Sequence, residues 1–200
     1  MFKYGIIGMM SLFLTETTIN PGSRFFELSK ENAAILISGT STLHDWKMYL
    51  KVFDCNANFI EEESQLKGID EVTFTCRTTD LKSDNSLMDK KAYSALKSGS
   101  FPEIKFNMIS AMEISPDNNK FSNVLRGNLF IAGKSISVLI PINGSLSNIN
   151  GINRIDVSGE TELKMSDFAI TPPTAMMGAL KTDDRITVSF TLQFLQKPVK

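Results

Sequence analysis

The sequence predicts an all-β protein in which about eight antiparallel strands close into a barrel. From residue 33 onwards, apolar and polar residues alternate with a period of two in run after run, which is typical of antiparallel strands with one dry face. Turn-forming pairs separate several runs, among them Gly133-Lys134, Asn143-Gly144 and Asn150-Gly151. Several runs exceed ten residues. This length favours tilted barrel strands over a two-sheet sandwich, which would also satisfy the alternation.

The N-terminal segment, residues 1–20, is predicted to be a signal peptide without a clear cleavage site. Lys3 precedes an apolar run from Tyr4 to Leu14, which has the length of a signal-peptide core and is too short to cross a bilayer as a helix. The alternative is a buried N-terminal strand or helix. We therefore expect a periplasmic or secreted protein whose barrel domain occupies residues 24–200.

The stretch Gly39–Trp46 joins the first two strand-like runs and holds the only His and the only Trp of the chain. Neighbouring residues on a strand point to opposite faces, so His44 and Asp45 do not form an acid–base pair by adjacency. We interpret His44 as a buried, hydrogen-bonded ring near the barrel interior rather than as a catalyst.

The two cysteines, Cys55 and Cys76, fall on inward-facing positions of neighbouring runs. In an exported protein such a pair raises the question of a disulfide. Direct cross-strand geometry is restrictive, and two buried free thiols are the alternative. Both readings stay open at this point.

Two stretches depart from the period of two. Residues 86–98 carry apolar side chains at helical spacing, with Asp84 or Asn85 as a cap and Gly99 as a stop, and predict a helix between strands. Residues 172–180 begin with two prolines, and we expect a short helix near one barrel end. Met176 and Met177 in this stretch would either cover an apolar ligand or complete the core.

Composition and motifs argue against several function classes. The net charge is −1 with both signs interspersed, which excludes a basic stripe for nucleic acid. Neither of the common glycine-rich phosphate loops occurs, and one His with two separated Cys is too few for a zinc site. We expect no enzyme, no metal and no cofactor. An outer-membrane barrel would need apolar residues outside; the charged outward set in residues 156–164 favours an apolar interior.

The ordered pieces of the chain resemble the YceI-like, lipocalin-like family of bacterial exported proteins over roughly residues 31–195. They are Gly39–Trp46, the helix followed by Phe101–Phe106, Gly127–Gly133 and Met165–Thr182. The His-Asp-Trp and Pro-Pro-Thr-Ala-Met-Met forms are similar to a Bacteroidetes-type branch. The resemblance implies an eight-stranded barrel that binds a polyisoprenoid, such as a quinone tail, without catalytic residues. Ala169 replaces a glycine that is usual in the family.

The function predicted from these observations is a periplasmic protein that holds an isoprenoid lipid, or a similar long apolar ligand such as a quinone, inside a barrel. The alternative is a structural or stress-related envelope protein with a packed barrel. The expected partners are an apolar lipid and, transiently, a membrane; the oligomeric state is not predicted. The residues expected to line the cavity are His44, Trp46, Phe53, Phe59, Phe74, Phe106, Met108, Phe168, Met176, Met177 and Phe190.

Overall fold

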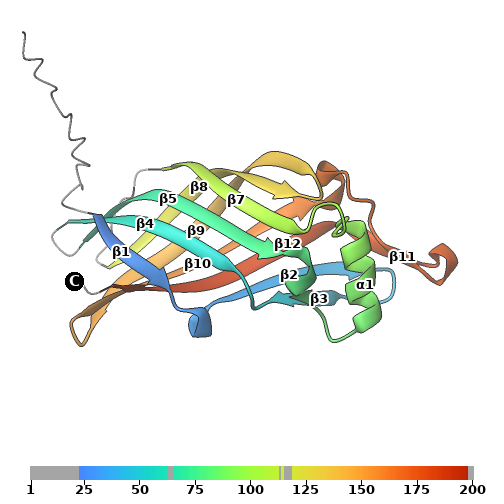
Figure 1. Ribbon diagram of the computed structural model, residues 1–200, viewed down its shortest axis with the longest axis horizontal. Helices are drawn as coiled ribbons and strands as arrows, with labels where there is room; N and C mark the ends of the chain where they lie inside the picture. The colour runs from blue at the N-terminus through green and yellow to red at the C-terminus, as the bar shows by residue number, and fades with distance from the viewer. Residues whose placement is uncertain (1–22, 63–64, 113, 115–118, 198–200) are drawn as a thin grey trace, which may run out of the picture.

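The computed structural model of the chain describes residues 23–62, 65–112, 114 and 119–197 (Figure 1). The predicted signal peptide, residues 1–20, lies outside the described residues. In the described part of the chain, no helix has the length and apolar character needed to cross a membrane.

The described residues form strands, one α-helix and short 3₁₀ turns. The strands are β1 (Ser23–Leu28), β2 (Ala34–Ser41), β3 (Trp46–Leu50), β4 (Asp54–Glu62), β5 (Gln65–Arg77), β6 (Leu81–Lys82), β7 (Glu103–Ala111), β8 (Lys120–Ile131), β9 (Lys134–Ile149), β10 (Ile152–Lys164), β11 (Thr174–Ala175) and β12 (Leu180–Gln196). The helix is α1 (Ser86–Ala95), and the 3₁₀ turns are η1 (Lys30–Asn32), η2 (Thr78–Asp80), η3 (Met165–Phe168) and η4 (Met176–Gly178).

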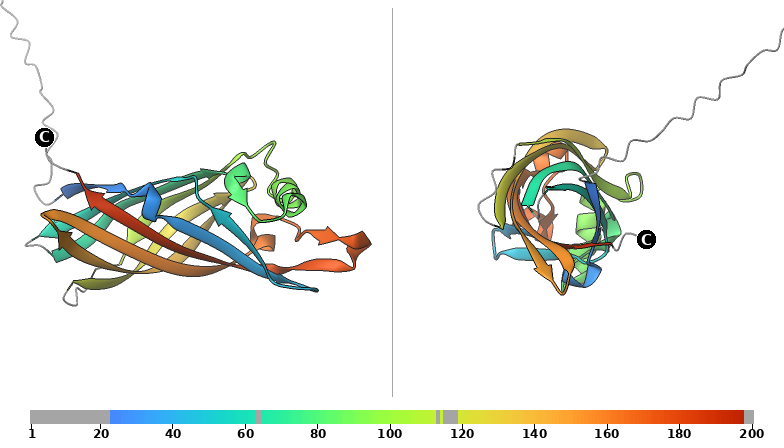
Figure 2. Two further views of the ribbon diagram at one scale, coloured as in Figure 1. Left: turned by 90° about the horizontal axis from the view of Figure 1, so that it is seen from below. Right: turned by 90° about the vertical axis from the view of Figure 1, so that its left-hand side faces the viewer.

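The strands form one strongly curled antiparallel sheet in the order β1-β4-β5-β7-β8-β9-β10-β12-β2-β3-β6, with β11 paired only to β12. Strand β1 pairs with β4 along one edge and with the end of β12 along the other, so the hydrogen bonding closes on itself there. The end-on view in Figure 2 shows the strands arranged in a ring. The predicted all-β, antiparallel character is confirmed, and a two-sheet sandwich is not formed.

The predicted count of eight strands is wrong. The short strands β1, β6 and β11 lie outside the long alternating runs, and residues 51–53 separate β3 from β4. At that break the period of two continues, but the inward positions change from even to odd numbers: Met48 and Leu50 are buried on β3, and Cys55 and Ala57 on β4.

Two predicted turns have different outcomes. Asn150 and Gly151 both have positive φ (53° and 83°) and reverse the chain between β9 and β10, as expected. Asn143-Gly144, in contrast, lies within β9. The glycine is there because the Phe121 ring of β8 covers it: an added Cβ would lie 2.3 Å from that ring.

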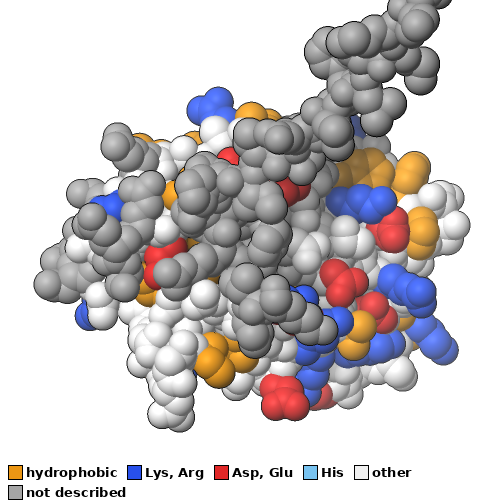
Figure 3. Space-filling model, turned by 60° about the vertical axis from the view of Figure 1, so that its left-hand side comes forward, with side chains coloured by type: hydrophobic (Ala, Val, Ile, Leu, Met, Phe, Trp, Pro, Cys, Tyr) orange, Lys and Arg blue, Asp and Glu red, His pale blue; other side chains and the backbone are white. Residues whose placement is uncertain are grey.

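The apolar residues of the alternation face the interior. On β4, for example, Cys55, Ala57 and Phe59 are buried, whereas Asp54 and Asn56 are exposed. On the outer surface, acidic and basic side chains lie near one another, as one face shows in Figure 3.

The end of the sheet near β1 is filled by aromatic rings. The Phe59 ring lies edge-on to Phe26 at 5.5 Å and to Phe194 at 5.3 Å between centroids. Ile155 beside them is fully buried. This packing closes the interior at that end.

The other end of the sheet carries α1, which confirms the helix expected between strands (Figure 1). Asn85 is its cap, and its side chain accepts hydrogen bonds from the backbone N–H groups of Leu87 and Met88. Asp89 is buried and accepts bonds from the Ser83 backbone N–H and hydroxyl at 2.8 and 2.7 Å. These bonds fix the first turn of α1 against the end of the sheet.

The short helix expected in residues 172–180 is reduced to the 3₁₀ turn η4 within a hairpin. Strand β11 pairs with the start of β12. Met177 (φ 53°) and Gly178 (φ 91°) both have left-handed backbone conformations. Such conformations reverse the chain and cannot continue a helix.

Candidate functional site

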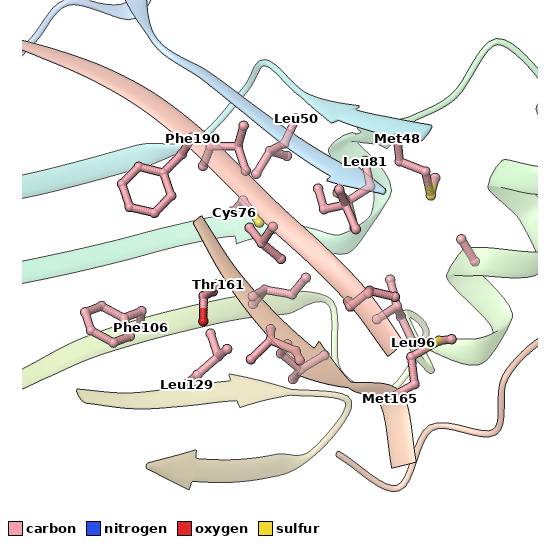
Figure 4. Close-up of a pocket in the computed structure, with 18 of the residues that line it drawn as sticks. Met48, Leu50, Cys76, Leu81, Leu96, Phe106, Leu129, Thr161, Met165 and Phe190 are labelled. Atoms are coloured by element: carbon pink, nitrogen blue, oxygen red, sulfur yellow. The ribbon is translucent and has the colours of Figure 1, made fainter. Parts of the chain in front are cut away.

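A cavity of about 510 Å³ runs through the interior of the curled sheet. Its wall follows β12 from Leu180 to Phe194, so the cavity is long. Figure 4 shows apolar side chains from several strands pointing into it, among them Leu50, Cys76 and Leu129. Its volume lies within the range of about 300–1,000 Å³ that is common for small-molecule sites.

The cavity stays open because inward-facing aromatic rings lie over glycines of neighbouring strands. A Cβ at Gly127 would lie 2.3 Å from the ring of Phe106, and one at Gly159 would lie 2.4 Å from the ring of Phe190. Each ring therefore covers a bare stretch of backbone instead of extending across the interior. Rings of this size would otherwise fill a small barrel.

The polar residues of the wall gather at the end of the cavity beside α1. They come from the β2–β3 connection, from α1, from the end of β10 and from the hairpin. Lys91 Nζ donates a hydrogen bond to the Thr174 carbonyl oxygen at 2.6 Å, which ties α1 to β11. These rim residues are Ser41, His44, Asn85, Lys91, Lys164, Thr174 and Thr182.

A polar network outside the cavity includes the buried residues Glu61 and Asn153. Asn153 Nδ2 donates to both carboxylate oxygens of Glu61 at 3.0 and 3.1 Å, and its Oδ1 accepts from Asn148 Nδ2 at 2.6 Å. The network links β4 to β9 and β10. None of these residues lines the cavity.

His44 lies at the rim and is exposed, so the expectation of a buried ring is wrong. The chain turns back on itself between β2 and β3, which places this residue outside the packed interior. Its Nδ1–H donates to the Asp45 carbonyl oxygen at 2.9 Å. Among the described residues, no three His, Cys, Asp or Glu side chains come together as a metal site.

Trp46 forms part of the cavity wall just below the rim. Its Nε1–H donates to the Thr40 carbonyl oxygen at 3.2 Å, and its indole covers Gly39 on the adjacent strand β2. The Gly39–Trp46 stretch therefore shapes the entrance.

The structure brings many of the expected lining residues together around the cavity. Phe53 lies instead in the packed core, where its ring is 5.6 Å from that of Phe74, and Met108 is also outside the wall. Met177, at the tip of the hairpin, is fully exposed, and the Met176 side chain lies outside what the structure describes. The expected residues that do line the cavity are His44, Trp46, Phe59, Phe74, Phe106, Phe168 and Phe190.

The sequence reasoning missed two parts of the wall. The first is Thr161, whose inward position follows from the alternation Val157, Gly159, Thr161, Leu163 along β10. The second is Met165 in η3, which is buried beside the predicted lining residue Phe168. For Met165 no periodic signal was available, because a 3₁₀ turn of four residues is too short to show one.

The two cysteines are buried and free, and the disulfide left open above is not formed. Cys55 lies opposite Phe74, two residues before Cys76 on β5, so the thiols are diagonal neighbours. Diagonal positions are about 7–8 Å apart, too far for a disulfide without backbone movement. Burial raises the pKa of each thiol to about 12. Both therefore act as small apolar side chains of the wall.

The chain is similar to one sequence family and to several solved structures. The sequence model of the YceI-like domain matches residues 26–194, whereas no curated protein matches the chain. Among solved structures, the chain is similar to BcnA of Burkholderia cenocepacia (15% identity, TM-score 0.62, covering 84% of this chain and 99% of that one). It is also similar to a YceI protein of Campylobacter jejuni (16%, 0.60, 99% and 100%).

A third similar structure is a polyisoprenoid-binding domain from Saccharophagus degradans implicated in plant cell wall breakdown (10% identity, TM-score 0.61, covering 88% of this chain and 99% of that one). At identities this low, the structural likeness shows a shared fold.

Proposed function

Because the chain belongs to the YceI-like domain family, we propose that it binds an isoprenoid lipid, or a similar long apolar ligand, inside its curled sheet. The observation that carries the proposal is the cavity of about 510 Å³ with an almost wholly apolar wall below its rim. The polyisoprenoid-binding domain among the similar structures supports the same ligand class.

The physical basis of such binding is transfer of an apolar chain out of water. A chain that loses about 300 Å² of apolar surface gains roughly 7.5 kcal/mol, at about 25 cal/mol per Å². Part of this gain offsets the lost freedom of the ligand. Affinity therefore needs no catalytic or charged group, and we propose no chemical step.

The ligand would enter from a membrane, since a long apolar chain is scarcely soluble in water. The rim offers apolar side chains for a transient contact: Leu43 is 67% exposed and Leu87 is 62% exposed. Leu87 also lines the cavity. A lipid could thus pass from the bilayer to the wall along apolar surface.

The remaining proposals concern location and lineage. We propose export to the periplasm or medium because Lys3 and the apolar run Tyr4–Leu14 have the composition of a signal peptide. Cell fractionation tests this. The His44-Asp45-Trp46 sequence supports a Bacteroidetes-type branch, which a phylogeny of full-length family members tests.

The competing function is a structural envelope protein with a fully packed interior. The size of the cavity argues against it, because a packed barrel leaves few voids larger than a water molecule. Native mass spectrometry distinguishes the two functions. A co-purifying lipid on the wild-type protein is expected, and protein that carries no lipid and takes up none from vesicles would contradict the proposal.

A matched pair of variants makes the test specific to the cavity. Leu129 lies in the wall and is labelled in Figure 4, whereas Leu139 is 56% exposed on the outer surface of β9. Leu129→Trp should fill the cavity and reduce bound lipid at least tenfold. Leu139→Trp, which adds the same volume outside, should leave the bound lipid unchanged. Equal lipid loss in both variants would argue against the cavity as the site.

A further inference from the structure

Thr161 places a hydroxyl in the otherwise apolar part of the cavity. Apart from the Trp46 indole, whose N–H is already paired with the Thr40 carbonyl oxygen, it is the one polar side chain below the rim among the described residues that line the wall. Figure 4 shows Thr161 among the apolar residues that line the cavity, including Phe106 and Leu129. A valine has almost the same shape and would continue the apolar wall without a break.

Thr161 lies below the rim and well short of the closed end. It is three residues from the rim residue Lys164 on β10, and its partner Val188 on β12 is six residues from Phe194 at the closed end. At about 3.3 Å per residue, the rim is roughly 10 Å away and the closed end roughly 20 Å away along the strands. A polar head group held at the rim therefore does not reach this hydroxyl.

The Thr161 hydroxyl has no hydrogen-bond partner among the described residues, and it is not sealed from the cavity. A pure hydrocarbon chain in the cavity would remove water from this group and leave it unpaired. An unpaired buried hydroxyl is unfavourable, and a ligand oxygen opposite it would remove that cost.

The backbone of β10 at Thr161 is paired with another strand on one side only. Pairing between β9 and β10 ends at Ile142 and Gly159, while β10 continues to Lys164 paired only with β12. Thr161 is the first inward-facing residue beyond that point. Polar backbone groups of this strand edge therefore lie near the hydroxyl.

We propose that Thr161 is a subsite for an oxygen atom carried within the buried part of the ligand. The ligand class is then a long apolar chain with a hydroxyl, ether or carbonyl oxygen away from its end, or a quinone whose ring enters the cavity. In both cases the shared chemistry is a hydrogen bond between the Thr161 hydroxyl and that oxygen. This inference rests on the proposed function, because it assumes that the cavity holds an apolar ligand.

Binding of octadecanoate and 10-hydroxyoctadecanoate tests the subsite, because the two probes share a head group and length. Calorimetric titration of the lipid-stripped protein should show about tenfold tighter binding of the hydroxylated probe. Thr161→Val should abolish this preference by weakening the hydroxylated probe alone. Thr161→Ser, which keeps the hydroxyl, should retain the preference.

Binding of a short-tailed quinone is a second experiment. If Thr161→Val lowers the affinity for the quinone more than the affinity for the hydroxylated probe, the bound oxygen is a ring carbonyl.

The outcomes separate this inference from the proposed function. If both fatty acids bind with equal affinity to the wild-type protein and to Thr161→Val, and the quinone is unaffected, the cavity binds apolar chains and the subsite is refuted. If no probe binds the wild-type protein at all, the proposed function fails and the subsite fails with it.

Discussion

Replacing Gly39 with alanine tests how the entrance of the cavity is built. A Cβ at Gly39 would lie 2.4, 2.8 and 3.1 Å from three atoms of the Trp46 indole, and these are its nearest neighbours. Ordinary van der Waals contact begins near 3.4 Å. The clash is therefore with one side chain, and the indole has to retreat by about 1 Å (3.4 Å minus 2.4 Å).

The cost follows from what the indole loses. Its Nε1–H donates to the Thr40 carbonyl oxygen at 3.2 Å, already at the long end of normal geometry, so a retreat breaks this bond. Loss of the bond costs about 1 kcal/mol, and the displaced ring adds about 1–2 kcal/mol of packing strain. We expect Gly39→Ala to lower the free energy of unfolding by about 2–3 kcal/mol. For a domain of this size, Tm would fall by roughly 4–12 °C.

The chain contains a single Trp, so its fluorescence reports the displacement directly. The emission of Gly39→Ala should shift to longer wavelength, and urea unfolding gives the stability. Gly99→Ala is the matched control, because no atom lies within 4 Å of its added Cβ; it should be neutral or slightly stabilising through the unfolded chain.

A double-mutant cycle then tests the mechanism. In a Trp46→Leu background, followed by circular dichroism, Gly39→Ala should cost less than about 1 kcal/mol, because the clashing ring is gone. If Gly39→Ala costs the same with and without the indole, or leaves the wild-type emission unchanged, the reasoning about this contact is refuted.

Three further predictions concern strain, pH and membrane contact. Ala169 has φ 53°, so Ala169→Gly should raise the free energy of unfolding by about 1 kcal/mol in urea titration; a loss of stability would contradict the strain. Burial raises the thiol pKa of Cys55 and Cys76 from 9.0 to about 12, so between pH 9 and 12 the unfolded chain loses these protons first and stability falls. The fall is about 1.4 kcal/mol per thiol and pH unit, and a Cys55→Ala/Cys76→Ala variant that showed the same slope would exclude the thiols as its cause. Leu87→Ser at the rim should slow lipid uptake from vesicles several-fold, whereas Ile152→Ser at the closed end should not; equal rates would argue against the rim as the docking surface.

The sequence predicted the features that depend on local periodicity. The inward positions of Phe59, Phe106 and Phe190 follow from the period of two. Helix chemistry predicted a cap at Asp84 or Asn85, and Asn85 is the cap. What the sequence did not reveal were the shortest strands, because β6 and β11 have two residues each and are too short to show a period.

The hairpin at residues 174–181 was misread for a different reason. Two prolines followed by Thr-Ala-Met-Met indicate a helix start. The left-handed backbone of Met177 and Gly178 instead reverses the chain before a helix forms. A Met in the left-handed backbone conformation is uncommon, so residue preferences do not predict it. The exposed position of His44 could not be predicted either, because it depends on where the chain turns between β2 and β3.

The glycine and ring pairs explain why periodicity alone cannot separate a packed barrel from a hollow one. An inward Phe is compatible with both, and the outcome is set by the residue that faces it on the neighbouring strand. Phe190 pairs with Gly159 across β12 and β10, and with no side chain in the way the ring lies over the bare backbone. A valine or leucine at position 159 would push the ring into the lumen and fill it. Whether the barrel is hollow is therefore encoded in the register between strands, and register becomes visible only once the strand order is known.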